Sequence, residues 1–230
     1  MSNNSAESAS CIQCGQCCRN GGPALHRQDQ DVLQSGLILA RDLYTLRTGE
    51  LAHVQAEGKL TPLKGEIVKI APSLCASPGD WTCRFLTPTS ACAIYKNRPQ
   101  ECQTLFCKKP EALLKMSCVD HLGRKEILAL LQAPPWWPEL IEAHADGCGY
   151  ELLTRMAQDL DNNPEARRKF LQLVEFDRSF RDLVLEKKAA QKEELNFLFG
   201  RPLLQTIIMF GLDARPGPDG SIKLVKITEI

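Results

Sequence analysis

The stretch CIQCGQCC at residues 11–18 decides how this chain is organised. Two sulfurs of a C-x2-C pair can reach the same ion from one tight turn, as they do in zinc knuckles and iron–sulfur loops. A second group of cysteines lies in WTCRFLTPTSACAIYKNRPQECQTLFC at residues 81–107, with gaps wide enough to need a folded scaffold. We expect both stretches to form one metal-thiolate site whose ligands are Cys11, Cys14, Cys17, Cys18, Cys83, Cys92, Cys102 and Cys107.

Length, composition and charge limit the class of protein. The chain has 230 residues, of which 43% are hydrophobic, so it can bury a substantial core. Lys+Arg and Asp+Glu are equal at 28 each, and the formal net charge is zero. Because this balance gives no basic field, we expect no nucleic-acid partner.

The cysteines must be interpreted together with the compartment. Residues 1–10, MSNNSAESAS, resemble a disordered tail and not a secretory signal. The apolar run LLQTIIMFGL at residues 203–212 is too short for a bilayer and suits a buried helix, so we expect no membrane segment and a cytoplasmic location. Thiols are kept reduced there, and eleven is an odd number of cysteines, so metal binding is favoured over a disulfide framework.

The fold expected from the pattern is α+β and mostly helical, with a small cysteine-rich metal-binding core and a helical C-terminal lobe. Apolar residues at mostly helical spacing predict a helix over residues 31–48, with Gly36 as a candidate break. Residues 66–70 read as a strand, and residues 84–86 and 93–95 as two more on either side of a turn. A helix over residues 98–105 would carry Cys102.

The proline- and tryptophan-rich stretch LQAPPWWPEL at residues 131–140 predicts a corner between two lobes. We therefore expect a tail over 1–10, a cysteine-cluster metal-binding domain over 11–130 and a helical lobe over 139–230. Within the second lobe the expected elements are helices over 138–145, 150–160, 164–187 and 202–210 and a strand over 222–227.

The occupant of the cysteine site is zinc or an iron–sulfur cluster. Zinc bound by four cysteines is structural, while C-x2-C-x2-C also resembles the bacterial ferredoxin run, although the three-residue gap and the trailing Cys-Pro are missing. Neighbouring side chains such as those of Cys17 and Cys18 diverge, which favours two centres, or one centre plus accessory thiols. Basic residues that could balance the thiolate charge flank both groups, namely Arg19, Arg84, Lys96, Arg98, Lys108 and Lys109.

The remaining cysteines and histidines are weaker candidates. Cys75, Cys118 and Cys148 are expected to be small buried residues. Among the histidines, His26 is the best substitute ligand because it lies closest to the first group, whereas the others are expected on the surface or in the core.

The cysteine pattern resembles the YkgJ-type cysteine-cluster family, the CxxCxxCC zinc- or iron-chelating domain. The resemblance rests on CIQCGQCC, on CRFL and CAIYKNRP, and on ECQTLFC, and it covers residues 11–107. It implies metal chelation by the eight cysteines. Some relatives are associated with flagellin lysine N-methylation, so the alternative function is an iron–sulfur-dependent protein-modifying transferase. The chain has no glycine-rich nucleotide loop to support a methyl donor. A third hypothesis is a module whose helical lobe binds a protein partner.

Overall fold

The computed structural model describes the chain in eight ranges, namely residues 11–54, 59–74, 77, 79–105, 111–116, 119–160, 162–216 and 222–227. The expected tail over residues 1–10 lies outside them. Within these ranges the fold is α+β and mostly helical, as predicted. No helix of the described ranges combines the length and the apolarity that crossing a bilayer requires.

The strands of the N-terminal half form two antiparallel two-stranded sheets, which we call together the ribbon. Strand β1 (Leu43–Leu46) pairs with β4 (Ile67–Ile70), and β2 (Leu51–Val54) pairs with β3 (Lys59–Pro62) between them in the chain. All four residues of β1 are buried, and in β4 the buried Val68 and Ile70 alternate with the half-buried Ile67 and Lys69. This alternation confirms the predicted strand at residues 66–70.

The helix predicted over residues 31–48 is wrong in its second half. Helix α2 covers only Gln30–Gln34, and Gly36 follows with a φ of 73°, a left-handed conformation that ends helices at low cost. The chain then enters β1, where Leu43 pairs with Ile70. Over so few residues the apolar spacing fits a helix and a strand equally well. The pairing with β4 makes this segment a strand.

The two strands predicted around the TPTSA turn are also wrong. Over the described residues 79–105 the structure has, in place of these strands, isolated bridges of Cys83 with Pro72 and of Leu86 with Cys92, followed by a 3-10 turn at Tyr95–Asn97. The segment has too few regular backbone pairs to form a ladder. The next prediction is confirmed, since helix α3 (Gln100–Thr104) carries Cys102.

Helices dominate the rest of the chain. The predicted helices correspond to α6 (Trp137–Cys148), α7 (Tyr150–Ala157), α8 (Pro164–Glu186) and α10 (Leu203–Thr206). The strand predicted at residues 222–227 is β6 (Ile222–Lys226), which pairs with β5 (Leu212–Pro216). Asn163 caps α8, because its Oδ1 accepts hydrogen bonds from the backbone N–H groups of Glu165 and Ala166, with Pro164 in the first turn. The other bounds are α4 Glu111–Met116, α5 Arg124–Leu130 and α9 Leu195–Phe199.

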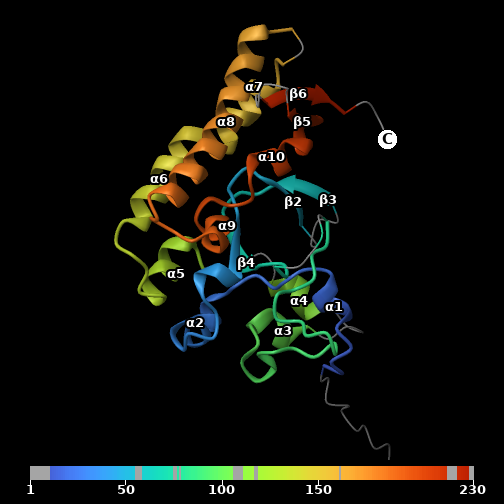
Figure 1. Cartoon of the computed structure of the whole chain (residues 1–230). Helices are drawn as coiled ribbons and strands as arrows, with labels where there is room; N and C mark the ends of the chain where they lie inside the picture. Colours follow the sequence, from blue (N-terminus) through green and yellow to red (C-terminus); the bar gives the residue numbers. More distant parts are fainter. Residues whose placement is uncertain are drawn as a thin grey trace, which may run out of the picture.

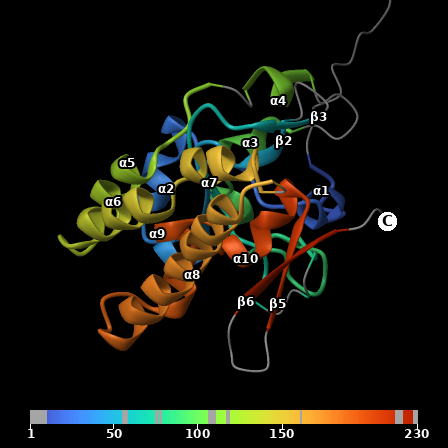
Figure 2. The ribbon, with the colours of Figure 1, turned by 90° about the horizontal axis from the view of Figure 1, so that it is seen from above.

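Figure 1 shows α6 and α8 side by side along one flank, with α1 (Gln16–Arg19), α3 and α4 at the opposite end. In Figure 2 the β5–β6 hairpin lies beside α8. One apolar cluster joins the two halves: it contains Leu43 and Ile70 from the ribbon and Phe197 and Phe199 from α9. The Thr45 hydroxyl also donates a hydrogen bond to the carbonyl of Phe197 at 2.7 Å. The ribbon is therefore packed directly against the C-terminal half.

The first cysteine segment is attached to the ribbon through a glycine. A Cβ on Gly22 would lie 2.3 Å from the carbonyl oxygen of Ile70, a separation that requires the backbone to move. We expect Gly22→Ala to lower the free energy of unfolding by about 1–3 kcal/mol in urea denaturation. Gly65→Ala is the matched control, because a Cβ there meets no atom within 4 Å, and this variant should be as stable as the parent.

Candidate metal centre

The first cysteine segment is a loop closed by a single helical turn. Helix α1 begins at Gln16 and has four residues, none of which is buried. The Arg19 guanidinium donates hydrogen bonds to the carbonyl of Cys14 at 3.3 Å and to the hydroxyl of Ser90 at 2.8 Å. This side chain therefore ties the first loop to the turn that precedes Cys92.

Two more hydrogen bonds join the cysteine segments. The backbone N–H of Cys83 donates to the carbonyl of Cys18 at 2.7 Å, and the Tyr95 hydroxyl donates to the carbonyl of Cys11 at 3.2 Å. Both ends of the first loop are thus bound to the second segment. The convergence that the sequence required is present, although the segments are separated by more than 60 positions.

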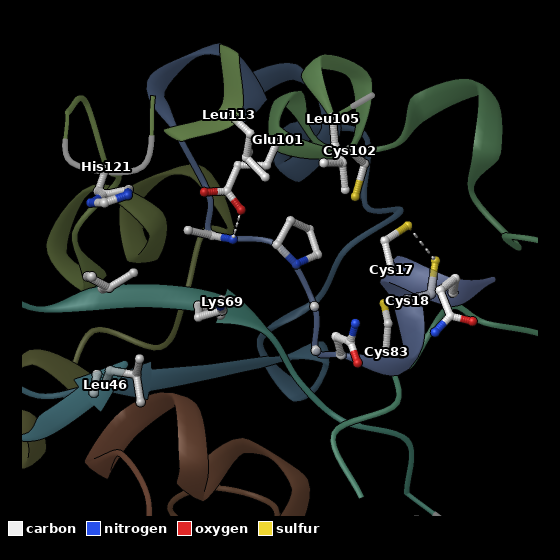
Figure 3. Close-up of a pocket in the computed structure, with 18 of the residues that line it drawn as sticks. Cys17, Cys18, Leu46, Lys69, Cys83, Glu101, Cys102, Leu105, Leu113 and His121 are labelled. Atoms are coloured by element: carbon white, nitrogen blue, oxygen red, sulfur yellow. Dashed lines mark hydrogen bonds between the residues drawn. The ribbon is translucent and has the colours of Figure 1, made fainter. Parts of the chain in front are cut away.

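The cysteines surround two adjoining pockets. A small pocket is lined by Cys11, Cys14, Cys17, Cys18, Cys92 and Cys102. A larger one, of about 450 Å³, shares Cys17, Cys18 and Cys102 with it and adds Cys83. Figure 3 shows these four cysteines gathered at one end of the larger pocket. Seven of the eight predicted positions line one or both of these pockets, but among the described residues no three of their sulfurs lie within 4.8 Å of one another. Cys107 lies outside the described residues.

The adjacent residues Cys17 and Cys18 do not diverge as expected. Their sulfurs lie 4.0 Å apart, with a weak hydrogen bond between them. Two thiolates on one tetrahedral zinc ion are about 3.8 Å apart at a Zn–S length of about 2.3 Å. The single turn of α1 therefore places both sulfurs close enough to bind one ion together, and they could equally bind two neighbouring ions.

Burial favours the protonated form of three of these thiols. It raises the pKa of Cys83 to about 11 and also raises the pKa values of Cys92 and Cys102, with repulsion from neighbouring sulfurs adding to the effect. The hydrogen bond between Cys17 and Cys18 raises the pKa of Cys17 and lowers that of Cys18. Several thiolates so close together need a positive charge among them, which a metal ion supplies.

The flanking basic residues divide into two groups. Arg98 stays at the site: its guanidinium lies 4.3 Å from the centre of the Tyr95 ring and donates to the carbonyl of Cys102. Its charge acts to lower the pKa of Cys92, against the larger effect of burial. Arg84 is instead paired with Asp42 at 2.7 Å, and Lys108 and Lys109 lie outside the described residues.

Cys148 is fully buried, as predicted, while Cys75 and Cys118 lie outside the described residues. Two groups with potential metal ligands were missed by the sequence: His26 with Glu101 and His121, and His144 with Cys148 and Asp177. The ligand atoms of each group lie within 4.8 Å of one another. His26, the predicted substitute ligand, faces Glu101 at 3.2 Å. Most of these residues are far apart in the sequence. Only His144 and Cys148, which are one helical turn apart, have a spacing that the sequence could have shown.

Comparison with known proteins agrees with the cysteine pattern. Residues 10–119 match the family model CxxCxxCC, described as a putative zinc- or iron-chelating domain. The matched range contains every cysteine of the chain except Cys148. No curated protein and no solved structure matches the chain. Residues 10–119 are therefore similar to the CxxCxxCC family, as the cysteine pattern predicts.

Proposed function

We propose that the chain is a cytoplasmic metal-binding protein that holds zinc or an iron–sulfur cluster through its cysteine-lined pockets. The proposed ligands are Cys11, Cys14, Cys17, Cys18, Cys83, Cys92, Cys102 and Cys107. The observation that carries the proposal is the convergence of seven of these side chains, from two distant segments, on two adjoining pockets.

The donor set fits these occupants. Thiolates are the preferred ligands of zinc and of iron–sulfur clusters, whereas hard cations such as Mg²⁺ prefer oxygen. Seven described thiols exceed the four that a single tetrahedral ion takes. The set therefore suits two centres, or one centre with accessory thiols beside it. When bound, zinc would cross-link the two segments, and an iron–sulfur cluster would add a redox couple.

Elemental analysis and an anaerobic absorption spectrum of the purified chain test the proposal. We expect zinc or iron in at least one equivalent per chain, with a brown charge-transfer spectrum if the metal is iron in a sulfide cluster. A chain purified anaerobically from metal-replete cells that contains neither metal, and binds neither when reconstituted, would refute it.

Substitution of one half-buried cysteine should separate ligands from core residues. Cys102 lines both pockets, so we expect Cys102→Ser to lower the bound metal by at least about tenfold relative to the parent at equal free metal. Cys148→Ser is the matched control, because Cys148 is buried beside His144 and lines neither pocket, so this variant should keep the metal that the pockets hold. Equal loss in both variants would assign the effect to unfolding and not to ligation.

A transferase or redox function of the same centre is the second candidate. It is favoured by the pocket of about 450 Å³, whose walls combine the cysteines with Lys69 and Glu101 and with apolar side chains such as Leu46. A pocket of this volume can hold a small substrate or a side chain beside the centre. A colourless chain that contains only zinc would exclude the iron–sulfur form of this candidate.

A further inference from the structure

The far end of the larger pocket carries a second set of metal-ligating groups that includes no cysteine. His26 and His121 face each other across an isolated antiparallel bridge, with their ring centres 4.7 Å apart. Glu101 reaches the same point from α3, one residue before Cys102. Figure 3 shows the Glu101 carboxylate directed toward His121, away from the cysteines. One ligand atom of each of the three residues lies within 4.8 Å of the others.

Hydrogen bonds fix which atoms of this group face one another. The Nδ1 of His26 lies 3.0 Å from the carbonyl oxygen of Val119. Because a carbonyl only accepts, Nδ1 must carry a proton, which leaves Nε2 as the free nitrogen of the neutral ring. One carboxylate oxygen of Glu101 accepts a hydrogen bond from the backbone N–H of Ala24 at 2.8 Å. Histidine ligands of metals are commonly held by such a bond from the second ring nitrogen to a carbonyl.

The contact between His26 Nε2 and the Glu101 carboxylate needs a positive charge. His26 Nε2 lies 3.2 Å from the other carboxylate oxygen of Glu101. With His26 neutral, two lone pairs would face each other in a site where the His26 side chain is fully buried. Either a proton shared between His26 and Glu101 or a bound cation removes this repulsion. Two ligands on one tetrahedral ion are separated by about 3.3 Å at metal–ligand lengths of about 2.05 Å, which is the separation seen here.

The position of His121 favours a bound cation over a proton at this contact. A protonated His26 needs only Glu101, whereas His121 adds a third donor to the same point. Within the described residues no hydrogen-bond partner is found for the His121 ring nitrogens, so this ring is not committed elsewhere in that part of the structure. Both Glu101 and His121 also line the larger pocket, while His26 lies behind them. An ion held by the three would have its open coordination position toward the pocket.

We propose that His26, Glu101 and His121 form a second metal site for a divalent transition-metal ion such as Zn²⁺ or Fe²⁺, separate from the cysteine ligands. Two imidazoles and one carboxylate form the donor set that suits these ions, and three protein ligands leave room for water or a small ligand. The site shares no ligand with the cysteine cluster. Failure of either proposal therefore leaves the other standing.

Anaerobic titration with Co²⁺ of the full chain, with its cysteine-bound metal in place, tests this site. We expect the parent to bind one further equivalent of cobalt whose spectrum shows d–d bands but no sulfur-to-cobalt charge transfer. His121→Gln should weaken this binding by at least about tenfold, without loss of the cysteine-bound metal. Glu101→Gln should do the same, and its matched control is Glu139→Gln, an exposed position on α6 that should bind as the parent does.

Three outcomes would overturn the proposal. The first is a parent chain that takes up no further cobalt. The second is a His121→Gln variant that binds the extra equivalent as tightly as the parent, which would leave His26 and Glu101 as an ordinary buried ion pair. The third is a sulfur-to-cobalt charge-transfer band on the extra equivalent, which would assign it to the cysteine pockets. Circular dichroism of both variants must match the parent, and His121→Gln is the safer of the two because it removes no described hydrogen bond.

Discussion

A chain stripped of its metal by an anaerobic chelator should exchange the amide hydrogens of residues 11–23 and 81–105 much faster than the metal-loaded chain. Regular structure in these segments is limited to α1, α3 and one 3-10 turn, and none of the three buries a residue of its own. Little apolar burial therefore opposes the conformational entropy of these loops. Structural zinc contributes about 10 kcal/mol or more to the folding of small cysteine-ligated units, so its loss should dominate.

Hydrogen exchange followed by mass spectrometry checks this expectation, and the chain offers an internal reference. Phe170 and Val174 of α8 are fully buried in a second apolar cluster with Leu203 of α10, which contains none of the proposed ligands. Peptides from these helices should keep their protection after chelation. If residues 11–23 and 81–105 exchange equally slowly with and without metal, the metal is not what holds the two segments together.

Asp177→Asn should be the most destabilising single substitution in the helical half. Asp177 is almost fully buried and accepts hydrogen bonds from His144 at 2.7 Å, from Arg181 at 2.8 Å and from the backbone N–H of Leu203 at 2.8 Å. Replacing the carboxylate by an amide leaves the buried Arg181 guanidinium without its counter-ion. Breaking a buried pair in this way costs about 3–5 kcal/mol, measured as a fall in the free energy of unfolding in urea.

The electrostatics of the surrounding residues support this magnitude. Burial lowers the pKa of His144 to about 4, and the nearby Arg47 and Arg181 charges act in the same direction, so His144 is neutral at pH 7 and donates through Nε2. Asp177 is thus the anion that balances this cluster. Asp182→Asn is the matched control, because Asp182 lies exposed on the same helix, and its effect should stay within about 0.5 kcal/mol. Equal stability of the two variants would show that Asp177 does not balance Arg181.

The long helices and the cysteine site could be predicted because their signals are local. Asn163 and Pro164 mark the start of α8, and C-x2-C spacing places sulfurs on one turn whatever follows. Short elements gave no such signal. Leu43 to Leu46 fits a helix or a strand by spacing alone, and only the distant partner β4 decides between them.

The site at His26, Glu101 and His121 could not be predicted from the sequence, because it too depends on contacts between distant segments. Its three residues come from three separate parts of the chain and share no spacing rule. Only the bridge between His26 and His121 and the placement of α3 bring them together. The expected boundary near residues 131–138, and with it the division into lobes, stays a prediction.

The packing of α9 against the ribbon bears on how the protein is made. Leu195, Phe197 and Phe199 complete the apolar cluster around Leu43, and the carbonyl of Phe197 accepts the Thr45 hydroxyl bond. Since a ribosome delivers residues in order, the cysteine-bearing half cannot complete its apolar interior until α9, at residues 195–199, has been synthesised. A nascent chain would thus expose its thiols and its incomplete apolar face together until α9 is made.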